Sequence, residues 1–195
     1  MRDVPWQQAE WLNRPSVLEQ DGADLVVTTD DKSDLWRVTS YGFVHDSGHA
    51  LLTPLPPGTA VEVTFRTDLD HEFDQAGVLV RVDPTTWLKA GVELSDGAPQ
   101  LGAVATNGRS DWSQSPVPEW AGRPVTMRVS RAGDALTVRA RVEDEPWRTI
   151  RLAPLDPNAE ASAGPFCCSP TRRGLRVRFT RFAKGAADKT LHGEP

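Results

Sequence analysis

Two neighbouring segments of the chain alternate polar, charged or indole side chains with apolar ones. Residues 75–82 read Gln-Ala-Gly-Val-Leu-Val-Arg-Val, and residues 87–94 read Trp-Leu-Lys-Ala-Gly-Val-Glu-Leu. Alternate residues of a β-strand point to opposite faces, so each segment is predicted to be a strand with one apolar face. The opposite faces carry side chains that can stack on a ligand or hydrogen-bond to it: Gln75, Arg81, Trp87, Lys89 and Glu93.

The pairing register of these two strands follows from their apolar faces. A slip by one residue would bury Lys89 and Glu93 in the core, so two registers remain. Arg81 opposite Lys89 would set like charges directly across from each other. Arg81 opposite Trp87 instead allows a cation–π contact and leaves a five-residue loop. We predict this second register.

The predicted register sets Gln75 opposite Glu93 and Gly77 opposite Gly91. Two glycines in the middle of a polar face omit two side chains, so a ligand can approach the backbone there. The alternative is a face in contact with solvent on which glycine is merely tolerated. Both interpretations stay open, and the mixture of Trp, Arg, Lys, Gln and Glu around the glycines favours testing the first.

Further candidates lie outside this hairpin. Residues 106–113 read as a turn that runs into a short strand, in which Asp111 either caps local backbone donors or lines the groove. Asp34 and Trp36 share one face of another short strand. For each of the seven tryptophans, core packing competes with stacking on a ligand. The predicted ligand-binding residues are Trp36, Gln75, Arg81, Trp87, Lys89, Glu93, Asp111 and Trp112.

Signatures of catalysis are sparse. Glu93 is the one carboxylate that the two segments contribute to the polar face, so a glycoside hydrolase would need a second from Asp34, Asp111 or a loop. The sequence has no Gly-x-Ser-x-Gly elbow and no dinucleotide fingerprint. Residues 45–49, His-Asp-Ser-Gly-His, suit a polar turn better than a metal site. We expect no metal and no cofactor, assign no catalytic residue, and keep Glu93 as a candidate acid or base.

Short alternating runs separated by Gly, Pro, Asp and Asn dominate the chain, and no sustained helical periodicity is present. The predicted strands are residues 25–29, 35–39, 50–53, 60–67, 75–82, 87–94, 100–105, 124–130, 135–142, 147–152, 159–167 and 175–182. This pattern is typical of an all-β sandwich or barrel. We expect a single domain over residues 1–183 and a flexible C-terminal tail over residues 184–195.

Composition excludes several classes of function. The 195 residues include 22 Lys and Arg against 27 Asp and Glu, a net charge of -5, which argues against nucleic-acid binding. No apolar run approaches the roughly 20 residues of a membrane span, and the first residues lack a secretory signal. Adjacent Cys167 and Cys168 would form a strained disulfide, so we expect two buried thiols and a cytoplasmic protein.

Several runs together carry a resemblance to a known family. They are Asp-Leu-Trp-Arg at 34–37, Phe-Asp-Gln-Ala-Gly-Val-Leu-Val-Arg at 73–81, Trp-Leu-Lys-Ala-Gly-Val-Glu at 87–93, Ser-Asp-Trp-Ser at 110–113 and Ser-Pro-Thr-Arg-Arg-Gly-Leu at 169–175. From about Trp11 to Phe182 the chain resembles the family of unknown function labelled "regulation of enolase"-like. The resemblance implies a concanavalin A-like jelly roll of the lectin/glucanase type, with two stacked antiparallel sheets, one of them concave.

The resemblance bears on catalysis as well. Retaining glucanases of this superfold place a Glu-x-Asp-x-x-Glu-like run on one concave strand. The nearest run here is 72–77, Glu-Phe-Asp-Gln-Ala-Gly, in which glycine replaces the second glutamate.

We therefore expect a protein that binds a carbohydrate or a small polar ligand in a concave groove. One alternative is a glycoside hydrolase-like enzyme that uses Glu93. The other is a cytoplasmic regulatory protein that binds a metabolic enzyme or another protein partner. Nucleic acid and membrane are not expected partners.

Overall fold

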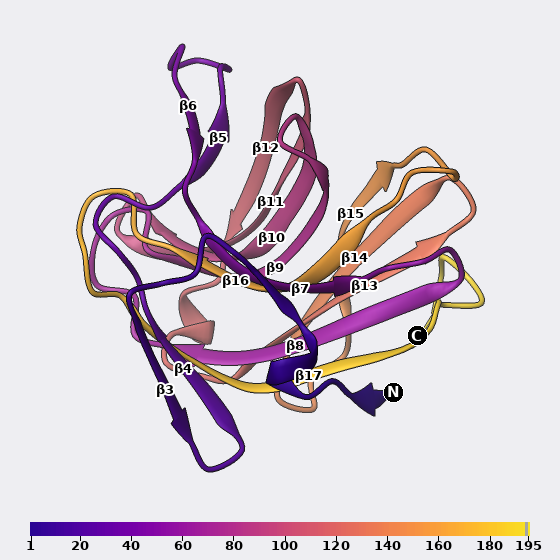
Figure 1. Ribbon diagram of the computed structural model, residues 1–195, viewed down its shortest axis with the longest axis horizontal. Coiled ribbons are helices and arrows are strands. Elements are labelled where there is room, and N and C mark those ends of the chain that lie inside the picture. The colour runs from indigo at the N-terminus through magenta and orange to yellow at the C-terminus, as the bar shows by residue number, and fades with distance from the viewer. Residues whose placement is uncertain (194) are drawn as a thin grey trace.

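The computed structural model describes residues 1–193 and 195, and most of these residues lie in β-strands (Figure 1). One sheet has the order β15 (Arg148–Pro154), β14 (Ala135–Val142), β13 (Val125–Ala132), β8 (Thr59–Thr67), β17 (Arg176–Ala186), β4 (Asp24–Thr28) and β3 (Val17–Asp21), and β1 (Arg2–Asp3) pairs with β17. The other has the order β12 (Arg109–Pro116), β11 (Ala98–Asn107), β10 (Thr86–Ser95), β9 (Gln75–Asp83), β16 (Ser162–Cys168), β7 (His49–Pro54) and β2 (Glu10–Leu12). We call them the eight-stranded and the seven-stranded sheet.

A separate hairpin of β5 (Leu35–Arg37) and β6 (Val44–Asp46) stands on the seven-stranded sheet. Figure 1 shows this hairpin projecting opposite β10, β11 and β12, which curl toward it and make this side of the sheet concave. Two short 3-10 helices, η1 (Trp6–Gln8) and η2 (Pro118–Trp120), complete the described elements. The prediction of an all-β jelly-roll sandwich with two antiparallel sheets is thus confirmed.

The main hydrophobic core lies between the two sheets, as the alternating strands predict. Val78 and Ala90 of the seven-stranded sheet belong to the same buried cluster as Val63 and Val129 of the eight-stranded sheet. Residues of the opposite parity in β9 and β10 face away from this core, toward the β5–β6 hairpin. The strand alternation therefore decides which side chains reach the concave face.

A second, smaller apolar cluster lies on the concave face. It consists of Leu35, Trp36, Ala50, Leu79, Trp87, Val104, Phe166 and Cys168. Leu35 of β5 has no exposed surface, and burial of a leucine side chain contributes about 2 kcal/mol. This cluster packs the base of the hairpin onto the sheet.

Some strand boundaries differ from those expected. Pairing of β9 with β10 continues through Asp83 and Thr86, with a bulge next to Trp87, so the connection is tighter than a five-residue loop. β17 ends at Ala186, so the first three residues of the expected tail belong to a strand. Strands β1, β2, β3 and β6 were not predicted, because each is short and mostly exposed and so lacks an apolar alternation.

None of the described residues forms a helix that is long and apolar enough to cross a membrane.

Candidate functional site

A pocket of about 400 Å³ lies between the β5–β6 hairpin and the concave face of the seven-stranded sheet. The hairpin and the residues flanking it contribute Lys32, Asp34, Trp36, Tyr41, Phe43 and His45. The sheet contributes Gln75, Lys89, Glu93, Val104 and Trp112, and two loops add Phe73, Pro170 and Thr171. The volume lies in the range of sites for small molecules. We call it the hairpin pocket.

The floor of the hairpin pocket is set by the predicted register of β9 and β10. Trp87 pairs with Arg81, Gly91 with Gly77 and Glu93 with Gln75, which confirms that register. Gln75, Glu93 and Lys89 therefore rise from two adjacent strands on the same side, as the alternation requires.

The two glycines of this register have a structural role. A Cβ atom added to Gly77 would overlap the backbone carbonyl of Ala90, and one added to Gly91 would overlap that of Ala76. Glycine at both positions lets β9 and β10 approach each other beneath the polar face. The pocket also has a shallow extension over Gly91 and Gly102 that reaches Gln114.

Lys89 lies at the bottom of the pocket and is almost fully buried. Its Nζ atom is 3.4 Å from Oδ1 of Asp34, the residue before β5. Burial disfavours the charged ammonium, but the Asp34 carboxylate and the nearby Glu93 outweigh it and raise the pKa of Lys89. Lys89 is thus a cation in the pocket, neutralised by a carboxylate from the hairpin.

Glu93 has a different environment from Asp34. Burial, and then repulsion by the carboxylates of Asp34 and Glu72, raise the pKa of Glu93 from 4.5 to about 7, although Lys89 opposes the shift. A carboxyl group with this pKa exchanges a proton near neutral pH, as a general acid or base must. Asp34 and Glu93 line the same pocket, so a second carboxylate does accompany Glu93.

Aromatic side chains form the walls of the pocket. The rings of Trp36 and Trp112 meet edge to face at 6.2 Å, and Trp36 contacts Tyr41 at 5.6 Å. Tyr41 stacks on Phe43 at 5.3 Å with nearly parallel rings, and Phe43 contacts His45. Tyr41 is 55% exposed and Trp112 is 39% exposed, so both rings leave apolar surface accessible to a ligand.

The base of the hairpin is tied to the sheet by two ion pairs. Besides Asp34 with Lys89, the Asp46 carboxylate accepts two hydrogen bonds from the guanidinium of Arg81, at 2.7 and 2.8 Å. Asp46 is the strand partner of Leu35, so both aspartates lie at the same end of the hairpin. On the other side, the backbone nitrogen of Arg37 donates to Oγ of Ser110 at 2.9 Å.

Of the eight predicted ligand-binding residues, the structure brings five to the hairpin pocket: Trp36, Gln75, Lys89, Glu93 and Trp112. Arg81 lies outside it. Its guanidinium binds Asp46, and the expected cation–π contact with Trp87 does not occur among the described residues.

Trp87 and Asp111 also lie outside the hairpin pocket. Trp87 is 4% exposed because the hairpin covers it together with Leu79 and Val104. Asp111 points to the other sheet, where its carboxylate accepts a hydrogen bond from Arg151 at 2.7 Å. Both residues border a different cavity of about 580 Å³ between β9–β12 and β14–β15.

The residues that the sequence did not single out come mainly from loops. Tyr41, Phe43 and His45 occupy every second position, which is the spacing of residues on one face of a strand. The signal is weak because Gly42 interrupts the run and the strand itself has only three residues. Phe73, Pro170 and Thr171 lie on two loops joined by the Arg172 guanidinium, which binds the fully buried Asp74. Phe73 has a backbone φ of 66°, a strained value of the kind found at functional sites.

The hairpin loop is also strained. Val38 and Ser40 adopt φ values of 64°, and a β-branched residue rarely enters the left-handed region. Such conformations persist where surrounding contacts impose them, here the hydrogen bonds between Val38 and Phe43 and between Gly42 and Val38. The loop therefore holds the aromatic side chains in a defined arrangement.

Two further places in the fold bring histidine and aspartate side chains together. The ring nitrogens of His49 are engaged by the carbonyl of Asn13 and the backbone nitrogen of Asp30, so His49 does not offer a metal ligand. Asp70, His71 and Asp74 cluster within metal-binding distance, but Arg172 already supplies a cation to both aspartates.

The cysteines are not reactive groups. Cys167 and Cys168 are buried free thiols, and burial raises the pKa of both. A thiol in this state is a poor nucleophile and a poor ligand.

Comparison with known proteins identifies relatives along the whole chain. The model of the family described as "Protein of unknown function (DUF1349)" matches residues 11–186. "Regulation of enolase protein 1" of Saccharomyces cerevisiae is 38% identical over 192 residues, which cover 98% of this chain and 96% of that protein.

Similar folds occur in solved structures. A crystal structure of a functionally unknown protein from Saccharomyces cerevisiae has a TM-score of 0.88 and 36% identity, over 94% of this chain and 98% of that one. A mutant of the GH43 protein BlXynB from Bacillus licheniformis has a TM-score of 0.72 at 12% identity. That match covers 95% of this chain but 38% of the GH43 protein, and at this identity it shows a shared fold alone.

Proposed function

Since the chain belongs to the DUF1349 family, whose function is not known, we propose from the geometry of its pocket that it binds a carbohydrate or a similar small polar ligand. The observation that carries the proposal is the pairing of aromatic walls with a polar floor in the hairpin pocket. A sugar ring has an apolar face, which stacks on an aromatic ring, and hydroxyl groups, which need donors and acceptors.

The distribution of groups in the pocket supports this ligand class. Trp112 of the sheet and Tyr41 of the hairpin both line the pocket with partly exposed rings. Gln75, Glu93 and Lys89 lie below them and supply amide, carboxyl and ammonium groups for ligand hydroxyls. The shallow extension toward Gln114 has a volume of about 20 Å³, enough for one small polar group of a ligand, and the Gln114 Oε1 atom is buried with no hydrogen-bond partner among the described residues.

Calorimetric titration with a panel of neutral mono- and oligosaccharides tests the proposal. We expect saturable binding of at least one sugar, and a loss of about tenfold in affinity for Trp112→Ala, since one stacking ring is worth about 1 kcal/mol or more. Trp147→Ala is the matched control, because Trp147 packs under Arg141 away from the pocket. Absence of binding across the panel, or equal effects of the two variants, would refute it.

A second candidate function is glycoside chemistry at Glu93. It is favoured by the pKa of about 7 for Glu93 and by Asp34 as a second carboxylate in the same pocket. A screen of chromogenic glycosides tests it: turnover should be lost in Glu93→Gln and retained in Glu160→Gln, which alters an exposed carboxylate elsewhere.

A third candidate is binding of a protein partner, as the name of the yeast relative suggests. The exposed tip of the hairpin supports it, since Tyr41, Phe43 and Val44 form an apolar patch. Binding to purified enolase of the same organism, abolished by Tyr41→Ser with Phe43→Ser, would favour it over the sugar. A cytoplasmic location belongs to the same proposal, and the two free thiols support it.

A further inference from the structure

Two arginines face each other on the outer side of the eight-stranded sheet, far from the hairpin pocket. Arg128 of β13 and Arg139 of β14 are direct cross-strand partners, and they are 5% and 2% exposed. Like charges in this position repel, and burial of either one is costly unless a counter-charge accompanies it. The source of their counter-charge therefore decides whether this part of the sheet is stable.

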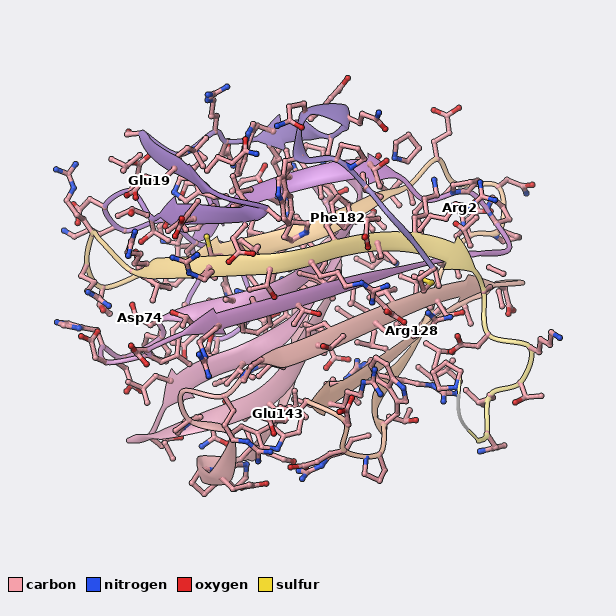
Figure 2. The ribbon with its side chains drawn as sticks, turned by 90° about the horizontal axis from the view of Figure 1, so that it is seen from below. Arg2, Glu19, Asp74, Arg128, Glu143 and Phe182 are labelled. Atoms are coloured by element: carbon pink, nitrogen blue, oxygen red, sulfur yellow. The ribbon has the colours of Figure 1, made fainter. Side chains whose placement is uncertain are left out.

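The chain that follows β17 supplies a carboxylate to Arg128. Oδ1 of Asp188 accepts hydrogen bonds from Nε of Arg128 at 2.8 Å and from Nη2 at 2.6 Å. The backbone nitrogen of Asp188 donates to Oγ of Ser130 at 2.8 Å. Figure 2 looks onto this outer face, and there Arg128 is labelled on the side of the molecule where the C-terminal segment leaves β17.

Arg139 depends on the same segment even more completely. Its Nη2 atom donates to the carbonyls of Leu191 at 2.9 Å and Thr190 at 3.4 Å, and its Nη1 atom donates to the carbonyl of Gly193. Its Nε atom lies 3.5 Å from Oδ2 of Asp188. Among the described residues, every polar partner of this guanidinium lies between residues 188 and 193.

The remaining charges nearby do not replace the segment. Glu62 accepts from Arg128 at 2.8 Å, but it also accepts from Arg181 at 2.7 Å. Arg181 also pairs with Asp3 at 3.3 Å. Without Asp188, Arg128 would share Glu62 with Arg181, and Arg139 would keep no carboxylate partner among the described residues. Arg128 and Arg139 thus form a preformed cationic site on the sheet, and the C-terminal segment occupies it as a ligand would.

We propose that Arg128, Arg139 and Ser130 form a binding site for an extended acidic peptide of a protein partner, which the C-terminal segment occupies until it is displaced. A peptide recognised here places one carboxylate between the two guanidinium groups, and the backbone N–H of the same residue donates to the Ser130 hydroxyl. The backbone carbonyls two and three residues further along the peptide accept hydrogen bonds from Arg139. Apart from the carboxylate these are main-chain groups, so any extended segment with one suitably placed Asp satisfies them. Charge complementarity favours an acidic partner.

Fluorescence anisotropy with a labelled, N-acetylated peptide of residues 188–193 tests the proposal on a chain that ends at Ala187. We expect the peptide to bind this shortened chain and not the full chain, whose site is occupied. The same peptide with Asp188→Asn should bind about tenfold or more weakly, because hydrogen bonds to a charged group are the stronger ones. Near-UV circular dichroism checks that the shortened chain is folded.

A second variant covers the case in which the shortened chain does not fold. A protease site inserted after Ala187 in the full chain allows the segment to be cut after folding. An excess of the labelled peptide should then displace the cut segment, and the peptide with Asp188→Asn should not. A folded, cut or shortened chain that binds neither peptide, or binds both equally, would overturn the proposal.

Discussion

The ammonium of Lys89 and the carboxylate of Asp34 lie 3.4 Å apart, although 55 residues separate them in the sequence. The pair joins the middle of β10 to the start of the β5–β6 hairpin, and so couples the floor of the hairpin pocket to its wall. Both side chains are largely buried, at 5% and 14% exposure, which gives the pair a larger role than a surface ion pair has.

Removal of one partner from this pair should destabilise the fold. Asp34→Asn leaves the Lys89 ammonium buried without its main counter-charge, and we expect a loss of about 3 kcal/mol in the free energy of unfolding, measured in urea. Asp111→Asn is the control, because its pair with Arg151 is exposed and should contribute less than about 1 kcal/mol. Equal losses in the two variants would contradict a structural role for the Lys89 pair.

Stability should depend on pH through Glu93. Its pKa is raised to about 7 in the folded chain, so between pH 4.5 and pH 7 the unfolded chain ionises first and the folded state loses stability as pH rises. Glu93→Gln removes this loss. We expect the free energy of unfolding of Glu93→Gln to equal that of the parent near pH 4 and to exceed it at pH 8 by up to about 3 kcal/mol.

Urea unfolding of the parent and of Glu93→Gln at both pH values measures this difference. Glu160→Gln alters an exposed side chain, so its stability relative to the parent should be the same at both pH values. A constant offset between Glu93→Gln and the parent across the pH range would show that Glu93 is not perturbed.

The hairpin should loosen before the sandwich unfolds. Asp46→Asn weakens the paired hydrogen bonds to Arg81, so amide hydrogen exchange at Leu35–Arg37 and Val44–Asp46 should accelerate by about tenfold while β13 and β14 keep their protection. Mass spectrometry of exchanged peptides measures the two regions separately. Asp21→Asn, which alters an exposed pair with Arg178, should leave both regions unchanged.

Gly91→Ala should be among the most damaging single substitutions. The Cβ atom of the new alanine would overlap the carbonyl of Ala76 in the adjacent strand. β9 and β10 would have to separate, which should lower the free energy of unfolding by about 3 kcal/mol. Gly133→Ala makes no such overlap and costs about 1 kcal/mol through its φ of 58° alone. Thermal unfolding of both variants gives the comparison, and a Gly91→Ala midpoint as high as that of Gly133→Ala would show that the strands adapt.

The sequence was sufficient for the sandwich and for the register of its central hairpin. Alternation fixed the faces of β9 and β10, and the repulsion between Arg81 and Lys89 excluded one of two registers. Both inferences depend on neighbours within one hairpin. The same local rules predicted that Gln75, Lys89 and Glu93 lie on one surface.

Contacts over long separations could not be derived in the same way. Nothing in residues 34–46 shows that this hairpin folds over β10, so the burial of Trp87 and the pairing of Arg81 with Asp46 were missed. Asp111 was predicted either to cap local backbone donors or to line the groove. Adjacent residues of a strand face opposite sides, so Asp111 points away from Trp112 and toward the other sheet, where Arg151 binds it.

The three ionisable groups at the bottom of the hairpin pocket have a combined consequence for selectivity. Below neutrality a protonated Glu93 leaves Lys89 and Asp34 to cancel each other, and above neutrality these three groups together carry one excess negative charge. Uncharged ligands should therefore bind best in mildly acidic solution, and ligands that carry an amine should gain affinity in mildly alkaline solution. A shift of less than two pH units around the physiological value would then change which molecules the cavity admits.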